Sequence, residues 1–290
     1  MKWPELRENG LISVHISVLL FGLAGIFGKI IFLPAVLIVL GRVFFGTLTI
    51  AMVIQLTKKL SFRLANKKHF YIMIGLGVLL AFHWFSFFYS IQLSTVAIGL
   101  LTFASFPVFT AFIEPVFFRE KFEPIYIGAA ILVLIGVYLI IPELNLNNEM
   151  TIGAIWGIFS GLSFAFLTLL NRKYVKSIQP ILITYYQDLF ACIVLLPFLF
   201  LIDFQFRMED LLLLILLGTV FTALAHFLYI RSLTKINART ASIISSLEPV
   251  YGILFAWIIL HEKPELKTII GGLIILLVAF LISLNKTKNK

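Results

Sequence analysis

The feature that most limits the fold of this chain is a series of long apolar runs separated by short polar segments. A helix needs about 20 apolar residues to cross the hydrocarbon core of a bilayer, and each of these runs is about that long. The ten predicted spans are residues 11–31, 35–56, 70–92, 95–118, 124–142, 152–172, 180–202, 211–233, 238–260 and 266–284. The sequence therefore predicts an all-α polytopic membrane protein with ten transmembrane helices.

Composition excludes several classes of protein. Hydrophobic residues make up 61% of the chain and charged residues only 13%, whereas soluble domains are nearer half apolar and a quarter charged. The net charge of +9 is spread over short loops, so it does not indicate nucleic-acid binding. The histidines lack metal-ligand spacing and Gly28-Lys29 fails the phosphate-loop pattern. We therefore predict no metal, no cofactor and no enzyme activity.

The basic residues predict the orientation of the chain. If the N-terminus lies inside, 18 of the 23 Lys and Arg residues fall in the inner segments. Cytoplasmic loops of membrane proteins are enriched in Lys and Arg. We therefore expect a multi-pass protein of the cytoplasmic membrane, with both termini in the cytoplasm and the loop 143–150 outside.

One stretch of the chain occurs twice. A weaker copy of residues 105–120 occurs at residues 247–262. Pro107 aligns with Pro249, and the same offset of 142 residues holds throughout the stretch. Each copy is predicted as an apolar helix with a proline near its middle, which neighbouring helices can accommodate in a membrane. Transporters commonly place their binding site at such broken or bent helices, one in each repeat.

The duplication divides the chain into two five-helix repeats, predicted at residues 1–146 and 147–290 of one integrated transmembrane domain. Because five spans are an odd number, the second repeat enters the membrane upside down relative to the first. Inverted repeats of this kind provide an inward-open and an outward-open state from one architecture. We therefore expect transport by alternating access.

Several charged residues are predicted inside the membrane, where they are costly and usually face a bundle interior or a water-filled path. Glu248 is the strongest of these signals, because it lies near the middle of its span. Arg42 and Asp188 occupy equivalent places in the two repeats. Predicted depth in the membrane suggests the partners of these charges. By this criterion Glu248 is the expected partner of Arg42, and Arg231 is the expected partner of Asp188 or Glu114. The alternative for Glu248 is a permanent ion pair that serves only helix packing.

Polar and aromatic residues on several spans predict a solute cavity. Aromatic runs in membrane helices commonly serve packing or interface belts, but His83 and His226 recur at nearly equivalent places in the two repeats. Polar tips amid apolar walls are typical of small-molecule pockets. The predicted cavity residues are His83, Trp84, Phe87, Thr102, Ser105, Trp156, Ser160, His226, Tyr229, Ser245 and Tyr251.

Three features of the chain together form a family pattern. They are the ten spans in two halves, Arg42 early in the second span, and the two proline-containing helices that each end in Glu-Lys. In these features the chain resembles the EamA family of the drug/metabolite transporter superfamily. The resemblance implies an exporter or permease for amino acids or other small metabolites, with a central cavity lined by spans one, three, four, six, eight and nine. Glu114-Pro115 departs from the apolar character that the family would have at that place.

Together these features predict a secondary transporter of a small metabolite, such as an amino acid, in which Glu248 couples transport to proton movement. The expected partners are a small-molecule solute, the lipid bilayer and protons, and the solute, the direction and the oligomeric state stay open. One alternative is a non-transporting accessory or scaffold subunit, which would have no need for Glu248. A membrane-embedded enzyme is the other, although the loops hold few acid, base or metal-binding groups.

Overall fold

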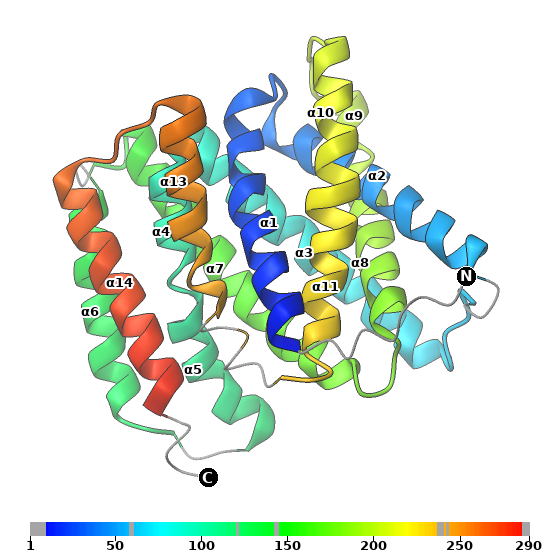
Figure 1. Ribbon diagram of the computed structural model, residues 1–290, viewed down its shortest axis with the longest axis horizontal. Helices are drawn as coiled ribbons and strands as arrows, with labels where there is room; N and C mark the ends of the chain where they lie inside the picture. Colours follow the sequence, from blue (N-terminus) through cyan, green and yellow to red (C-terminus); the bar gives the residue numbers. More distant parts are fainter. Residues whose placement is uncertain are drawn as a thin grey trace.

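The computed structural model describes residues 10–57, 61–119, 122–141, 145–236, 241 and 244–285, and these residues form helices without any β-strand. The predicted all-α fold is therefore confirmed for the described part of the chain. The helices in Figure 1 are α1 (Gly10–Ile30), α2 (Ala35–Leu56), α3 (Lys67–Leu93), α4 (Val96–Phe103), α5 (Phe106–Phe118), α6 (Ile125–Ile140), α7 (Glu149–Tyr174), α8 (Pro180–Leu195), α9 (Phe198–Leu201), α10 (Met208–Gly218), the π-helical η1 (Thr219–Leu224), α11 (Ala225–Ser232), α13 (Glu248–Leu260) and α14 (Leu266–Asn285).

The helices are those of a multi-pass membrane protein. Three of the ten predicted spans coincide with shorter apolar helices, α6, α13 and α14, and the remaining spans coincide with the longer segments named at the end of this paragraph. The start of the span predicted at 238–260 lies partly outside the described residues. Many large apolar side chains are exposed, for example Phe200 at 80% and Leu134 at 65%, as expected where lipid surrounds a protein. The segments long and apolar enough to cross a membrane are Gly10–Ile30, Ala35–Leu56, Lys67–Leu93, Val96–Phe118, Glu149–Tyr174, Pro180–Leu201 and Met208–Ser232.

The repeated stretch has the same local structure in both copies. α5 and α13 each have 13 residues, and each begins after a two-residue break in its span. Each helix ends on a residue in the left-handed conformation, Arg119 or His261, with φ of 55° in both cases. The beginnings, the ends and these caps are all displaced by the same 142 residues. The two copies therefore share their local structure as well as their sequence pattern.

The helix breaks correct one detail of the sequence-based prediction. Each span is interrupted just before its proline, whereas the prediction placed the proline within a continuous, bent helix. Pro107 and Pro249 occupy the first turn of α5 and α13, where the backbone N–H that proline lacks would have no partner in the helix. As a result, Glu248 is the first residue of α13 and not a residue in mid-helix.

Helices from the two predicted halves pack against one another across the molecule. α3 lies along α7, α2 lies along α8, and α1 lies between α11 and α13 (Figure 1). These contacts bury one large apolar cluster, which includes Val14, Ile38, Phe88 and Ile183. A second cluster around Tyr126 joins α4, α5, α6 and α14 at one side of the bundle. Helices of both predicted halves therefore meet in each of the two clusters.

Glycines allow the closest approaches between helices. A Cβ on Gly22 of α1 would lie 2.8 Å from the carbonyl oxygen of Glu248, and a Cβ on Gly252 of α13 would lie 2.9 Å from the carbonyl oxygen of Gly22. Close backbone approach through small residues is a common way to join helices in membranes. At this crossing it brings α1 against the start of α13.

Gly271→Ala should destabilise the protein by about 1–3 kcal/mol, the usual cost of overpacking. A Cβ there would lie 2.4 Å from the carbonyl oxygen of Gly136, so α14 would have to move away from α6. Gly128→Ala on α6 is the matched control, because its Cβ would have no neighbour within 4 Å and alanine favours helix. Thermal unfolding of the purified variants in detergent measures the difference. An unchanged unfolding temperature for Gly271→Ala would contradict this account of the packing.

Candidate functional site

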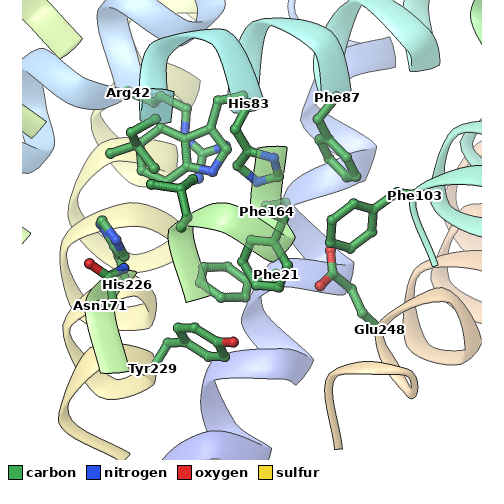
Figure 2. Close-up of a pocket in the computed structure, with 14 residues that line it drawn as sticks. Phe21, Arg42, His83, Phe87, Phe103, Phe164, Asn171, His226, Tyr229 and Glu248 are labelled. Carbon is green, nitrogen blue, oxygen red and sulfur yellow. The ribbon is translucent and has the colours of Figure 1, made fainter. Parts of the chain in front are cut away.

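A cavity lies among helices from both predicted halves, beside the residue at which α13 begins. Its volume is about 30 Å³, which is room for about two water molecules. A metabolite can therefore enter only if the surrounding helices move apart. The side chains around the cavity, most of them labelled in Figure 2, are Phe21, Ala24, Arg42, Leu80, His83, Trp84, Phe87, Phe103, Phe164, Leu167, Asn171, His226, Tyr229 and Glu248.

The cavity brings together seven residues singled out from the sequence. All six spans implied by the family resemblance contribute to its lining, through α1, α3, α4, α7, α11 and α13, and α2 adds Arg42. The seven residues are His83, Trp84, Phe87, His226 and Tyr229 from the predicted cavity set, and Arg42 and Glu248 from the predicted charges.

Other predicted cavity residues lie outside its lining. The hydroxyl of Thr102 donates a hydrogen bond to the carbonyl oxygen of Ile98 at 2.7 Å, and that of Ser105 donates to the carbonyl oxygen of Thr102 at 2.7 Å. Both hydroxyls thus bond within the span to which they belong, on either side of the break between α4 and α5. Such local bonds are the common alternative to solute contact for Ser and Thr in helices.

Trp156, Ser245 and Tyr251 also lie outside the lining of the cavity. The ring of Trp156 packs edge-on against Phe85 and Tyr89, with centroids 5.5 Å apart in each pair. Ser245 is buried, and Tyr251 is half-buried on α13. The positions of these residues within their spans were predicted, but the direction in which each side chain points was not.

Arg42 is 1% exposed and is held on two sides. Its Nε donates a hydrogen bond to Oγ1 of Thr222 at 2.9 Å, and its Nη2 donates to the carbonyl oxygen of Phe221 at 3.3 Å. The guanidinium carbon lies 3.9 Å from the ring centroid of Trp84. Both hydrogen-bond acceptors belong to η1, and π-helical turns are rare and frequently occur at functional sites. The π-helical turn therefore fixes the guanidinium at the cavity wall.

Asp188 and His226 form a buried pair beside the cavity. Nδ1 of His226 lies 3.2 Å from Oδ1 of Asp188, a contact in which the imidazole donates and the carboxylate accepts. The other oxygen, Oδ2, makes no hydrogen bond to a described residue, and a Cβ on Gly46 would lie 3.1 Å from it. The ring of Trp84 packs edge-on against His226. Trp84 thus contacts both the guanidinium of Arg42 and this pair.

His83 is fixed from α7. Its Nδ1 lies 3.0 Å from the carbonyl oxygen of Ser160, and because a carbonyl only accepts, Nδ1 carries the hydrogen. The imidazole ring also packs against Phe103 and Phe164, with centroids 5.8 and 5.2 Å away. Ser160, a predicted solute contact, therefore holds the ring of His83 and does not itself line the cavity.

Glu248 is 4% exposed, and its carboxylate makes no hydrogen bond to any described residue. Figure 2 shows this carboxylate directed into the cavity, toward the ring of Phe103. The rings of Phe21, Phe164 and Tyr229 line the same space. The ring centroid of Tyr229 lies 6.0 Å from that of Phe21 and 5.5 Å from that of Phe164. The carboxylate therefore faces a space with aromatic walls.

Polar contacts close the bundle beyond the cavity at the end where α1 meets α2, which is the top of Figure 1. Nζ of Lys29 donates to the carbonyl oxygen of Ser94 at 2.6 Å. Oε2 of Glu262 accepts a hydrogen bond from the backbone N–H of Val96 at 3.0 Å. These two contacts tie the ends of α1 and α13 to the corner between α3 and α4.

An ion pair between Glu114 of α5 and Arg172 of α7 lies at the opposite end. The guanidinium of Arg172 also lies 4.7 Å from the ring centroid of Phe118. Asp188 thus pairs with His226, and Glu114 pairs with Arg172, two contacts that the sequence analysis did not name. Depth alone did not reveal these partners, because they come from helices whose rotation the sequence leaves open.

Sequence reasoning also missed several lining residues. Phe164, Leu167 and Asn171 lie at intervals of three and four residues along α7, which places them on one helix face. Ser160 begins the same series, so extending the helix face from this predicted residue would have found them. Asn171 is the polar member of the set, and its Oδ1 accepts a hydrogen bond from Nε2 of Gln187 at 2.6 Å.

Comparison with known proteins agrees with this architecture. A transporter of Bacillus subtilis (strain 168), named uncharacterized transporter YxxF, is 24% identical over 269 residues, which cover 91% of this chain and 86% of that protein. An uncharacterized transporter of Archaeoglobus fulgidus is 28% identical over 277 residues, which cover 95% of this chain and 97% of that protein. An S-adenosylmethionine uptake transporter of Rickettsia conorii is 24% identical over 205 residues, which cover 69% of this chain and 67% of that protein.

A solved structure, described as a crystal structure of protein, matches 98% of both chains with a TM-score of 0.71 and 13% identity, which supports the fold alone. The pattern of the EamA-like transporter family matches residues 8–141 and again residues 151–284. These matches, together with relatives named as transporters, indicate a protein that moves a small molecule across a membrane and is not an enzyme. The chain therefore belongs to the EamA-like transporter family.

Proposed function

We propose that this protein is a secondary transporter that carries a small metabolite, such as an amino acid, across the cytoplasmic membrane by alternating access. The observation that carries the proposal is the central cavity, which is lined by Arg42 from the first half and by His226 and Glu248 from the second. Charges buried in a membrane protein are costly and are typical of solute and proton pathways. An accessory or scaffold subunit that transports no solute would have no use for buried charges around a cavity.

In this proposal, residues 1–146 and 147–290 are two five-helix repeats of opposite orientation, which together give ten spans. The equivalent breaks and caps of α5 and α13 support two repeats. In Figure 1, α5 runs from its break toward the bottom of the molecule and α13 runs from its break toward the top, which supports their inversion. Inverted repeats allow the two halves to exchange roles on the two sides of the membrane.

The cavity, at about 30 Å³, has polar contacts beyond both ends, and this arrangement suits an occluded intermediate. Opening toward the outside would break the contacts of Lys29 and Glu262 with the corner between α3 and α4. Opening toward the cytoplasm would break the ion pair between Glu114 and Arg172. Movement of one half against the other would expose the cavity to each side in turn.

Glu248 is the group that we propose to couple this movement to protons. It lies at the start of a half-helix, faces the cavity and makes no hydrogen bond to a described residue. A carboxylate that meets water first on one side and then on the other can bind a proton on one side and release it on the other. Carboxylates within membrane spans commonly serve as such proton carriers.

Transport by purified protein in proteoliposomes tests the function. The panel should hold labelled amino acids and also S-adenosylmethionine, because relatives from Rickettsia are named for its uptake. At least one compound should accumulate or exchange, and His226→Ala and Tyr229→Ala should alter its transport kinetics. Tyr71→Ala is the matched control, because Tyr71 is 69% exposed on the surface of α3. Unchanged kinetics in both folded cavity variants would contradict the cavity assignment, and no transport of any compound would favour an accessory role.

A cysteine placed at Asn147 should react with an impermeant thiol reagent in intact cells, after Cys192→Ser removes the native cysteine. Asn147 is exposed in a loop that is predicted to lie outside from the distribution of basic residues. A cysteine at Ser177, exposed in the loop between α7 and α8, is the control and should react only after permeabilisation. The reverse pattern of labelling would overturn the orientation.

A further inference from the structure

We propose that Glu248 and the aromatic rings that face it form a subsite for a positively charged group of the transported solute, such as a primary or quaternary ammonium. The inference deepens the transport function proposed above and rests on it. It assigns a chemical class to the solute, one that carries a cation, and it gives Glu248 two alternative occupants, a proton and this cation.

The buried charges around the cavity carry the inference. Two carboxylates, those of Asp188 and Glu248, are 0% and 4% exposed, and Arg42 is the permanent cation of the cavity lining. Burying an unpaired charge is costly. When both carboxylates are ionised and the histidines of the lining are neutral, one further positive charge is needed, and either a proton or a cationic group can provide it.

The position of the subsite follows from the hydrogen bonds. Asp188 already contacts His226, and Arg42 already donates to Thr222 and to a backbone carbonyl of η1. The carboxylate of Glu248 makes no such contact with a described residue, although it faces the cavity. Of the two carboxylates, it is thus the one that lines the cavity and makes no hydrogen bond to a described residue.

Aromatic rings around this carboxylate favour a cation further. Phe21, Phe103, Phe164 and Tyr229 line the same space, and ring faces attract cations more strongly when the cation has lost its water. A neutral group would gain only apolar burial there, and an anionic group would be repelled by the carboxylate of Glu248. The rings and the carboxylate therefore select the same sign of charge.

Proton and solute cation should compete for Glu248, because each neutralises the same carboxylate. Below the pH at which this group takes up its proton, the affinity for the cation should fall by up to about tenfold per pH unit. Arg42 lies across the cavity from Glu248 in Figure 2 and is fixed by its own hydrogen bonds, so it orients the solute cation away from itself. The charged and titratable groups lining the cavity with Glu248 are Arg42, His83, His226 and Tyr229.

Binding of three probes of similar size to the purified full chain in detergent tests the subsite. The probes are the phenethylammonium cation, neutral 2-phenylethanol and the 3-phenylpropionate anion, and isothermal titration calorimetry at pH 8 gives their affinities. We expect the cation to bind at least tenfold more tightly than the alcohol and the anion to bind most weakly. Glu248→Gln should weaken cation binding at least tenfold, abolish its pH dependence and leave binding of the alcohol unchanged.

Two further variants keep the test decisive. Glu209→Gln removes one carboxylate from an exposed position at the start of α10 and should leave all three affinities unchanged. Phe103→Leu keeps the carboxylate and most of the apolar volume but removes one ring, so it should weaken binding of the cation more than binding of the alcohol. It provides a second measurement if Glu248→Gln fails to fold.

Equal affinity for cation and alcohol, unaltered cation binding in Glu248→Gln, or no binding of any probe would each overturn the subsite. These results would leave the transport function standing if the wild-type protein still moves a metabolite in proteoliposomes. Conversely, binding that is selective for the cation in a protein that transports no compound of the panel would support the subsite and contradict the transport function.

Discussion

In proteoliposomes, Glu248→Gln should lose the accumulation of solute that a pH gradient drives, while exchange of solute across the membrane continues at saturating concentration. Glutamine has nearly the size of glutamate but cannot bind and release a proton. A gradient of one pH unit can drive about tenfold accumulation per coupled proton. In the variant the ratio of solute across the membrane should therefore fall to about one, whatever the gradient.

The measurement compares accumulation with and without an imposed pH gradient in wild type, Glu248→Gln and the surface control Glu209→Gln. Retained exchange shows that the variant is folded and still alternates between its two states. If Glu248→Gln accumulates solute as the wild type does, Glu248 does not couple transport to protons. The protein would then work as a facilitator or use another coupling group.

Arg42→Ala should lower the initial rate of transport at least a hundredfold. The change removes the hydrogen bonds to Thr222 and to the carbonyl oxygen of Phe221, and it leaves two buried carboxylates without their permanent cation. Removing one partner from a buried set of charges costs about 3–5 kcal/mol, which exceeds a hundredfold in an equilibrium constant. Arg42→Lys keeps the charge but loses the planar fork that reaches two acceptors, so we expect an intermediate rate.

Arg207→Ala is the matched control for Arg42→Ala. The guanidinium of Arg207 also lies over an aromatic ring, that of Phe32 at 4.2 Å, but Arg207 is exposed. Its loss should therefore change transport little. Size-exclusion profiles and thermal unfolding of each variant separate loss of transport from loss of fold. A folded Arg42→Ala protein that transports at the wild-type rate would exclude Arg42 from the site.

Much of the fold was predictable because its signals are local. Runs of apolar residues as long as a bilayer is thick identify membrane helices without any knowledge of their packing. The constant offset between Pro107 and Pro249 was likewise found by comparing one local sequence pattern with another. Glu248 and Arg42 stood out because a charge in such a run is costly wherever its partner lies. All of these inferences use residues close together in the chain.

The candidate site was predictable only in part, because its geometry depends on how each helix is rotated. Thr102 and Trp156 lie on spans that line the cavity, yet their side chains point elsewhere. The pair between Asp188 and His226 joins two helices whose relative rotation no sequence pattern specified. The break before Pro249 was also missed, because a proline in the first turn and a proline in a bent helix give the same sequence.

The π-helical turn η1 makes the cavity depend on the number of residues in span eight. A turn with i to i+5 hydrogen bonds holds one residue more than an α-helical turn, and successive residues of an α-helix are rotated by about 100°. Deleting one residue within Thr219–Leu224 would leave an apolar span that still crosses the membrane. It would also turn His226 and Tyr229 by about 100° relative to α10 and away from the cavity. The length of this turn thus decides which side chains of span eight face the cavity.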